Sequence, residues 1–294
     1  TWLSIKKIGA IPVPVDSCWL TQNLKIDELA EKLTRKTKAI VPVHIYGNLC
    51  DMEKISKFAK KWDLVVIEDA AQAHGQQIFD VRHPDRSFEV GTGARRAGKR
   101  LLAVGTDCSV GKMYTALAIE KELTSRGVNC DFRATGQTGI FIAGEGVSVD
   151  AVVSDFISGA TEWLAPENAP DHWDIVEGQG SLFHPSYAGV TMGLVHGAQP
   201  DALVLCHEPT RTHMRGLPHQ PLPDIATCIE GHLNAAHLTN PGARCIGIAV
   251  NTSAMESEQT RKELLKRLAV AHGMPAVDPV LDGVAPLVDA LEAI

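Results

Sequence analysis

Apolar residues near the N-terminus alternate between unbroken runs and runs with helical spacing. The unbroken runs at 38–46 and 64–70 flank a segment at 51–62 in which apolar positions recur every three or four residues. Unbroken runs are typical of buried parallel strands, and the spaced segment is typical of an amphipathic helix. Asp51 precedes this helix as an N-cap, and a second helix is predicted at 26–34. The order strand, helix, strand predicts a right-handed crossover and a parallel sheet.

A similar alternation begins again near residue 99. Strands are predicted at 100–106, 129–135, 173–178, 201–207 and 245–252. Helices are predicted at 111–125, 148–164, 224–238 and 256–272. Residues 78–99 are polar, contain proline and glycine and have no sustained period, which predicts a linker. The chain is therefore expected to be α/β, with a partial β-α-β segment at 1–77 and a doubly wound, mostly parallel sheet domain at 100–294.

Composition narrows the class of protein. Of the 294 residues, 45% are apolar, which excludes a disordered chain and suffices for a large core. No run of about 18 apolar residues occurs, so we expect no membrane partner, and the first residues lack a signal-peptide pattern. Seven cysteines without CxxC spacing favour reduced thiols in the cytoplasm over disulfides or a metal site. The net charge of −7 argues against nucleic acid as a partner.

The strongest motif is a loop between a predicted strand and a predicted helix. Residues 105–113 read GTDCSVGKM, and such a loop directs backbone N–H groups and a helix N-terminus at a phosphate. Lys112 adds a positive charge, and Gly111 allows close approach. Met113 replaces the Ser or Thr of the usual motif, whose hydroxyl ligates Mg²⁺, so the loop favours phosphate binding over ordinary nucleotide hydrolysis. The candidate phosphate-binding residues are Gly105, Thr106, Asp107, Cys108, Ser109, Val110, Gly111, Lys112 and Met113.

Further candidate residues follow the predicted strands, where ligands of open α/β sheets bind. Glu177 is suited to act as a general base or a metal ligand, and His184 and His207 are candidates for proton transfer. Arg211 and Arg215 are suited to bind a carboxylate. Each side chain also has a structural alternative, such as a helix cap, a salt bridge or a solvated turn.

Several segments between residues 79 and 294 carry a family resemblance. They include GTDCSVGKMYTALAIEKEL, DFRATGQTGI, EGQGSLFHPSYAGV and PDALVLCHEPTRTHMRG. These segments resemble the C-terminal P-loop domain of the bacterial D-glutamate N-acetyltransferase family, formerly an uncharacterised P-loop family. The resemblance implies acetyl transfer from acetyl-CoA, as co-substrate, to the amine of D-glutamate or a similar amino acid. It also implies substrate-binding roles for Arg133, Gln137 and Thr138.

The same loop leaves other activities open. GTDCSVGK is also similar to the phosphate loop of dethiobiotin synthetase and its P-loop relatives, a resemblance that implies a role for Asn251 beside the nucleotide base. An ATP- and Mg²⁺-dependent ligase or kinase is therefore one alternative, and a non-catalytic nucleotide-binding fusion is another. The acetyltransferase and the ligase or kinase would both act on a small-molecule substrate. We expect a homo-oligomer, because such enzymes commonly form one.

The N-terminal segment carries a different resemblance. Residues 8–77 resemble PLP-dependent sugar aminotransferases of DegT/DnrJ/EryC1/StrS type, most clearly in the stretch TKAIVPVHIYGNLCDMEKISKFAKKWDLVVIEDAAQAHG at 37–75. The resemblance implies that Asp69 pairs with the pyridine nitrogen of PLP and that Gln72 lies beside the cofactor. Because the segment with the Schiff-base lysine is absent, we interpret both as vestigial contacts and expect neither PLP nor aminotransferase activity. A net charge of +2 over 1–77 and −9 over the remainder also indicates two segments of different origin.

Overall fold

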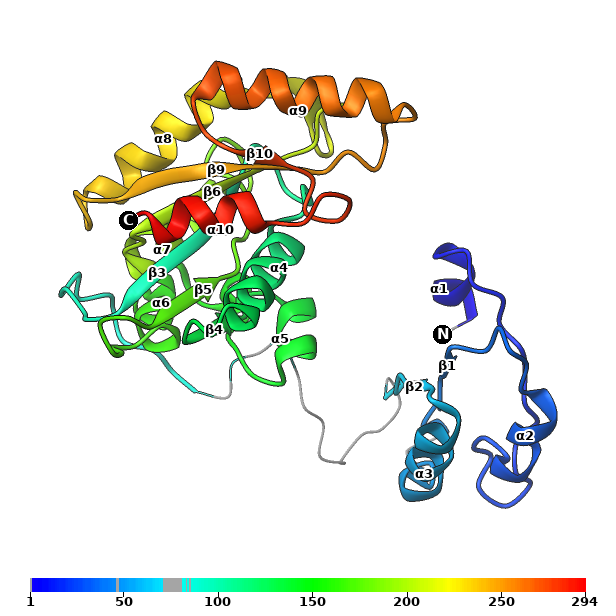
Figure 1. Ribbon diagram of the computed structural model, residues 1–294. Coiled ribbons are helices and arrows are strands. Elements are labelled where there is room, and N and C mark those ends of the chain that lie inside the picture. Colours follow the sequence, from blue (N-terminus) through cyan, green and yellow to red (C-terminus); the bar gives the residue numbers. More distant parts are fainter. Residues whose placement is uncertain (1, 46–47, 71–80, 83, 85) are drawn as a thin grey trace. The chain divides into compact units, whose positions relative to one another are not determined.

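The computed structural model describes residues 2–45, 48–70, 81–82, 84 and 86–294. The chain forms two compact units, Thr1–Phe79 and Asp80–Ile294 (Figure 1). No helix in the described ranges is long and apolar enough to cross a membrane. Gln72 lies outside the described residues.

The N-terminal unit contains the predicted strand, helix and strand in short form. Its elements are α1 (Trp2–Lys7), η1 (Ile26–Glu28), α2 (Leu29–Lys32), β1 (Ala39–Ile40), α3 (Met52–Trp62) and β2 (Val65–Val66). β1 and β2 are parallel, and the Asp51 side chain caps α3 by accepting from the backbone N–H of Lys54. Among the described residues, backbone pairing beyond the two strands continues as a bridge between Val43 and Asp69, and Pro42, which lies between, has no N–H to donate to a longer ladder. The predicted helix at 26–34 is a 3₁₀ turn followed by one α-helical turn.

The C-terminal unit is built on a parallel sheet, which confirms the predicted fold class. In the described part of the chain, six strands lie in the order β10-β9-β6-β3-β5-β4, all parallel. Their bounds are β3 (Lys99–Gly105), β4 (Cys130–Arg133), β5 (Trp173–Val176), β6 (Ala202–His207), β9 (Arg244–Val250) and β10 (Ala276–Val277). A separate antiparallel hairpin consists of β7 (His213–Met214) and β8 (Leu217–Pro221).

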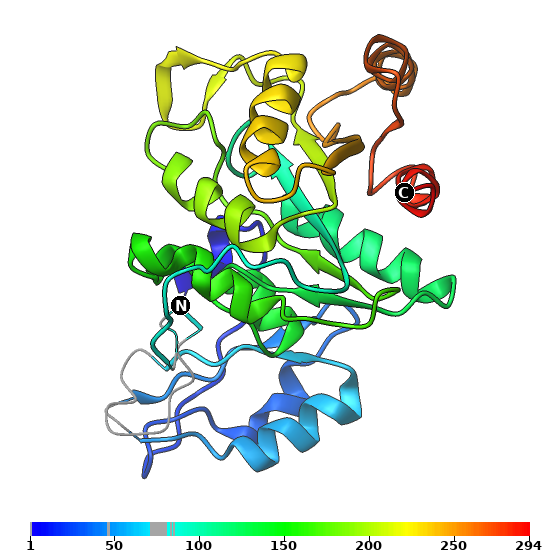
Figure 2. The same cartoon turned by 90° about the vertical axis from the view of Figure 1, so that its left-hand side faces the viewer.

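Helices cover both faces of this sheet. They are α4 (Lys112–Ser125), α5 (Gln137–Ala143), α6 (Ile157–Leu164), α7 (Ala188–Ala198), α8 (Ile225–His237), α9 (Glu258–His272) and α10 (Ala285–Glu292). Figure 2 shows α4 and α10 on one side of the sheet and α6 and α7 on the other.

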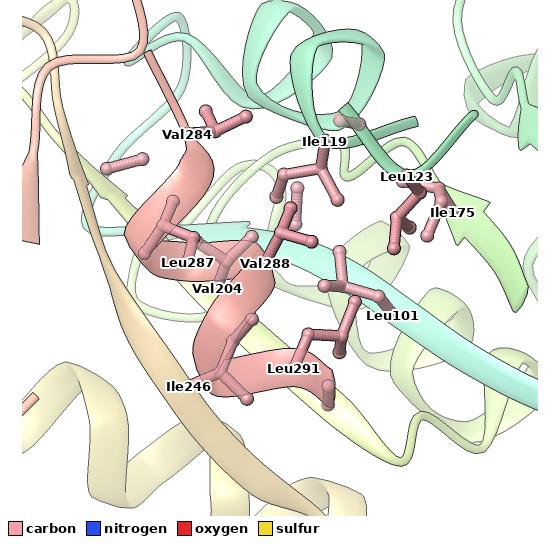
Figure 3. Close-up of a cluster of buried hydrophobic side chains, with 14 of the residues drawn as sticks. Leu101, Ile119, Leu123, Ile175, Val204, Ile246, Val284, Leu287, Val288 and Leu291 are labelled. Atoms are coloured by element: carbon pink, nitrogen blue, oxygen red, sulfur yellow. The ribbon is translucent and has the colours of Figure 1, made fainter. Parts of the chain in front are cut away.

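Alternate residues of the central strand supply two hydrophobic cores. Leu101 of β3 points to the face covered by α4 and α10, where it packs with Ile119 and Leu291 (Figure 3). Leu102 points to the opposite face and packs in the cluster that includes Val195 of α7. The period of two explains why strands buried on both faces read as unbroken apolar runs.

The structure corrects the expected helix at 148–164. Only its second half is α-helical, as α6, while Val149–Ala151 and Ser154–Phe156 form separate 3₁₀ turns. Val152 and Val153, both β-branched, separate the two turns, and Val152 has an extended backbone.

Residues 86–98, which we expected to belong to a linker, pack against α6 within the C-terminal unit. The carboxylate of Glu162 in α6 accepts hydrogen bonds from the backbone N–H groups of Thr92 and Gly93, at 2.8–3.0 Å. The ring centroid of Phe88 lies 5.7 Å from that of Trp163. A side chain at Gly159 would overlap the carbonyl oxygen of Glu89, so the helix and this segment approach closely.

Candidate functional site

The predicted phosphate loop lies at the carboxyl end of β3, in the centre of the sheet. β3 ends at Gly105 and α4 begins at Lys112, so residues 106–111 form the connecting loop. Ser109 and Gly111 have positive φ angles of 52° and 102°. Alternation between left-handed and right-handed conformations turns successive N–H groups toward one concave surface, which is the geometry of an anion nest.

The backbone of the loop provides a set of donors without acceptors. Within the described part of the chain, six consecutive N–H groups have no hydrogen-bond partner, those of Ser109, Val110, Gly111, Lys112, Met113 and Tyr114. The last three begin α4, where helix N–H groups are normally left unpaired. These donors and the positive end of the helix macrodipole fit a phosphate group.

Lys112 lies beneath the loop rather than in solvent. Its side chain is buried, and Nζ donates to the carbonyl oxygen of Asp107 at 2.9 Å. Burial lowers the pKa of the Lys112 ammonium below its usual value. Gly105 provides the room, because a Cβ there would lie 3.3 Å from Nζ and 2.8 Å from Val110 Cγ2.

Asp107 connects the loop to two arginines from the segment after β6. Its Oδ2 accepts from Arg211 Nη1 at 2.7 Å and from the backbone N–H of Arg215 at 2.8 Å, while Oδ1 accepts from the N–H of Cys108. Burial alone would raise the pKa of Asp107, but these hydrogen bonds outweigh it and lower the pKa below its usual range. The Arg215 guanidinium contacts the Ser109 hydroxyl.

Glu177 follows β5 at the same edge of the sheet. Its Oε2 accepts from the N–H groups of Thr135 and Gly136 at 2.9 and 3.1 Å, and Oε1 accepts from Gln179 Nε2 at 3.0 Å. Burial raises the pKa of the Glu177 carboxyl, although these hydrogen bonds and the charge of Lys112 act in the opposite direction. A side chain at Gly139 would overlap Oε2, so the first turn of α5 encloses the carboxylate.

The two candidate histidines, His184 and His207, differ in the hydrogen-bond partners of their ring nitrogens. His207 ends β6, and its Nδ1 lies 3.1 Å from the Thr106 hydroxyl. Burial lowers the pKa of His207, so the ring is neutral at pH 7. His184 is buried with both ring nitrogens engaged: Nδ1 accepts from the N–H of Ser186 at 3.2 Å, and Nε2 lies 3.2 Å from the Arg215 carbonyl oxygen. His184 therefore supports the loop that carries Arg215.

The remaining predicted residues lie in different places. Arg133 reaches back toward the start of β5, where Nε donates to Asp174 at 2.7 Å, so it is not directed at the phosphate loop. Gln137 and Thr138 are exposed in the first turn of α5, next to the backbone that holds Glu177. Asn251 follows β9, and its N–H donates to the carbonyl oxygen of His207 at 2.8 Å. In the N-terminal unit, Asp69 follows β2 and pairs through its backbone with residues 42–44.

Two groups of described residues have the ligand types and spacing of a metal site. They are Asp107, Cys108 and His184, and Asp131, His172 and Asp174, with ligand atoms within 4.8 Å of one another. In each group an arginine already binds a carboxylate, Arg211 in the first and Arg133 in the second. Gln179, which hydrogen-bonds Glu177, is a site residue that was not predicted from the sequence, although it stands two residues after Glu177 in the segment EGQGS.

Comparisons with known proteins match both units. Residues 89–288 match a family described as "Domain of unknown function (DUF1611_C) P-loop domain", and residues 1–98 match the DegT/DnrJ/EryC1/StrS aminotransferase family. Both family resemblances predicted from the sequence are therefore confirmed.

Three individual proteins illustrate the similarity. A protein of Pseudoalteromonas sp named D-glutamate N-acetyltransferase is 55% identical over 218 residues, which are 74% of this chain and 65% of that protein. The crystal structure of a DUF1611 family protein from Anabaena variabilis has a TM-score of 0.71 and 32% identity, covering 88% of this chain and 81% of that one. A dTDP-3-amino-3,6-dideoxy-alpha-D-galactopyranose transaminase of Aneurinibacillus thermoaerophilus is 52% identical over 73 residues, 25% of this chain and 20% of the transaminase. The chain thus spans slightly less than two thirds of its acetyltransferase relative and a fifth of the transaminase.

Proposed function

Because this chain belongs to the DUF1611 P-loop domain family, we propose that it is an N-acetyltransferase that uses acetyl-CoA to acetylate D-glutamate or a similar amino acid. The name of the Pseudoalteromonas relative, D-glutamate N-acetyltransferase, supports both N-acetyl transfer as the reaction and D-glutamate as the amino acid. The resemblance of residues 37–75 to aminotransferases does not change this proposal, since that match covers a fifth of a transaminase.

The observation that carries the proposal is the combination of the anion nest with Met113. The unpaired N–H groups of the loop and the buried Lys112 ammonium are suited to the phosphates of CoA. Met113 supplies no hydroxyl for Mg²⁺, whereas binding the phosphates of CoA involves no phosphoryl transfer and needs no such ligand. Mg²⁺ remains part of the ATP-dependent alternative.

Acetyl transfer requires the substrate amine to lose a proton and attack the thioester carbon. The C–N bond forms, the C–S bond breaks, and the sulfur leaves as the thiol of CoA after taking up a proton. Glu177, with its raised pKa, and the neutral ring of His207 are the candidate bases at this edge of the sheet. The Arg215 guanidinium, whose described partner is the Ser109 hydroxyl, is suited to a substrate carboxylate.

Ligand-induced thermal stabilisation of the chain and of Lys112→Ala tests the proposal. Acetyl-CoA and ATP are compared, each with and without Mg²⁺, because a ligand that binds only the folded state raises the midpoint. We expect stabilisation by acetyl-CoA without Mg²⁺, its loss in Lys112→Ala, and release of CoA thiol when D-glutamate is added.

Two other outcomes would contradict the proposal. Stabilisation by ATP only with Mg²⁺ would indicate a ligase or kinase. Stabilisation by acetyl-CoA without thiol release, for either enantiomer of glutamate, would indicate a non-catalytic binding module.

A further inference from the structure

We propose that Arg211 is a positioning residue that holds the phosphate loop in its anion-binding shape, and that it does not bind the amino-acid substrate. This inference rests on the proposed function, since it concerns the same loop, but it assigns Arg211 a role different from the one expected from the sequence.

The contacts of Arg211 all go to the loop or to its own segment. Nη1 donates to Asp107 Oδ2 and to the carbonyl oxygen of Cys108, both at 2.7 Å, and Nη2 donates to the carbonyl oxygen of Ser109 at 3.2 Å. Its Nε lies 3.4 Å from Glu208 Oε2. A guanidinium offers five donors in one fixed plane, whereas an ammonium offers three donors without a fixed plane, so the guanidinium is better suited to hold several acceptors of one loop in a set geometry.

These contacts determine the direction of the nest donors. In a planar trans peptide, the C=O and the following N–H point in opposite directions. When Arg211 holds the carbonyl of Cys108, the N–H of Ser109 points away from the arginine. The carbonyl of Ser109 fixes the N–H of Val110 in the same way. Both N–H groups belong to the consecutive set at residues 109–114 for which the described part of the chain provides no acceptor.

Lys112 holds the preceding peptide in the opposite orientation. Its Nζ donates to the carbonyl oxygen of Asp107, and the N–H of Cys108 turns to the Asp107 carboxylate at 2.7 Å. The reversal between these peptides occurs next to Ser109, whose φ is 52°. Arg211 also compensates the charge of the fully buried Asp107, which would otherwise repel a phosphate.

Pyrophosphate binding to the full chain, measured by titration calorimetry, tests this role without acetyl transfer. We expect Arg211→Ala and Arg211→Lys to weaken pyrophosphate binding about tenfold or more, because the N–H groups of Ser109 and Val110 are then no longer held in the direction of the phosphate and their hydrogen bonds to it are lost. Guanidinium chloride should restore part of the affinity of Arg211→Ala, and the same concentration of sodium chloride should not. Arg244→Ala is the matched control, because it also removes one positive charge, but Arg244 is exposed at the amino end of β9, on the edge of the sheet opposite the phosphate loop.

Steady-state kinetics separates the two roles of Arg211. The proposed role predicts a higher KM for acetyl-CoA and an unchanged KM for the amino acid. An unchanged pyrophosphate affinity together with a higher amino-acid KM would overturn it, as would a wild-type chain that binds no pyrophosphate. If the wild type binds pyrophosphate but not acetyl-CoA, the proposed function fails, while the calorimetric comparison of the variants still decides the role of Arg211.

Discussion

Replacing His232 by asparagine removes a buried titratable group from the core of the C-terminal unit. His232 is fully buried in α8, and its Nδ1 lies 2.7 Å from the carbonyl oxygen of Cys228. Because a carbonyl only accepts, Nδ1 carries the proton of the neutral ring. Nε2 is buried and has no hydrogen-bond partner among the described residues, so its protonation would bury an unpaired charge.

The cost of that protonation gives the expected effect. Burial, with a smaller contribution from the charge of Lys112, lowers the pKa of His232 from its ordinary value of 6.5 to about 4. Between these two values the unfolded chain binds a proton that the folded chain does not, so the free energy of unfolding falls as the pH decreases. By pH 4 the loss attributable to His232 is about 3 kcal/mol relative to pH 7.

Urea unfolding of the wild type and of His232→Asn, followed by far-ultraviolet circular dichroism from pH 7 to pH 4, measures this term. The asparagine amide retains a donor for Cys228 but does not titrate, so the stability advantage of the wild type should shrink by about 3 kcal/mol over this range. The carboxyl groups of the protein titrate equally in both chains, so their contribution to the free energy of unfolding cancels in the difference. A difference that is constant from pH 7 to pH 4 would refute the reasoning.

Two further predictions concern close approaches. Gly139→Ala should displace the Glu177 carboxylate from its two backbone donors and so raise the pKa of this carboxyl. The acid limb of the pH–rate profile should then move to higher pH, while the affinity for acetyl-CoA stays unchanged. An unshifted profile would contradict the role of Glu177 as the base. Glu162→Ala should release residues 92–93 and speed proteolysis within 86–98, whereas Glu167→Ala, an exposed neighbour, should not; equal rates in both variants would contradict the packing of this segment.

Local patterns in the sequence predicted the parts of the fold that local patterns control. The unbroken run at 100–106 identified β3 because both of its faces are buried, and Asp51 identified the start of α3 because a short acceptor caps unpaired N–H groups. The motif GTDCSVGK located the phosphate loop for the same reason, since its geometry depends on consecutive residues. α7 was not predicted because its sequence, AGVTMGLVHGA, is apolar on all sides and contains three glycines.

Local patterns in the sequence did not predict which residues the side chains of the site contact. Arg133 and Arg211 are both arginines in polar segments near strand ends, yet one binds Asp174 on the neighbouring strand and the other binds Asp107 in the phosphate loop. The choice depends on strand order, which places β6 beside β3 and β4 beside β5. Residues more than a hundred positions apart therefore meet, and no spacing in the sequence records this.

The charges around the loop then account for what kind of ligand it suits. Lys112, Arg211 and Arg215 bring three positive charges to one loop, and Asp107 offsets one of them. The protein itself thus supplies the positive field that Mg²⁺ contributes in a loop with a Ser or Thr after the lysine. Such a fixed field stabilises a bound diphosphate throughout a reaction, whereas phosphoryl transfer requires charge to be stabilised as it moves between the attacking and leaving oxygens. The ligand proposed above, CoA, suits this field, because its phosphates would serve for binding while the chemistry takes place at the thioester.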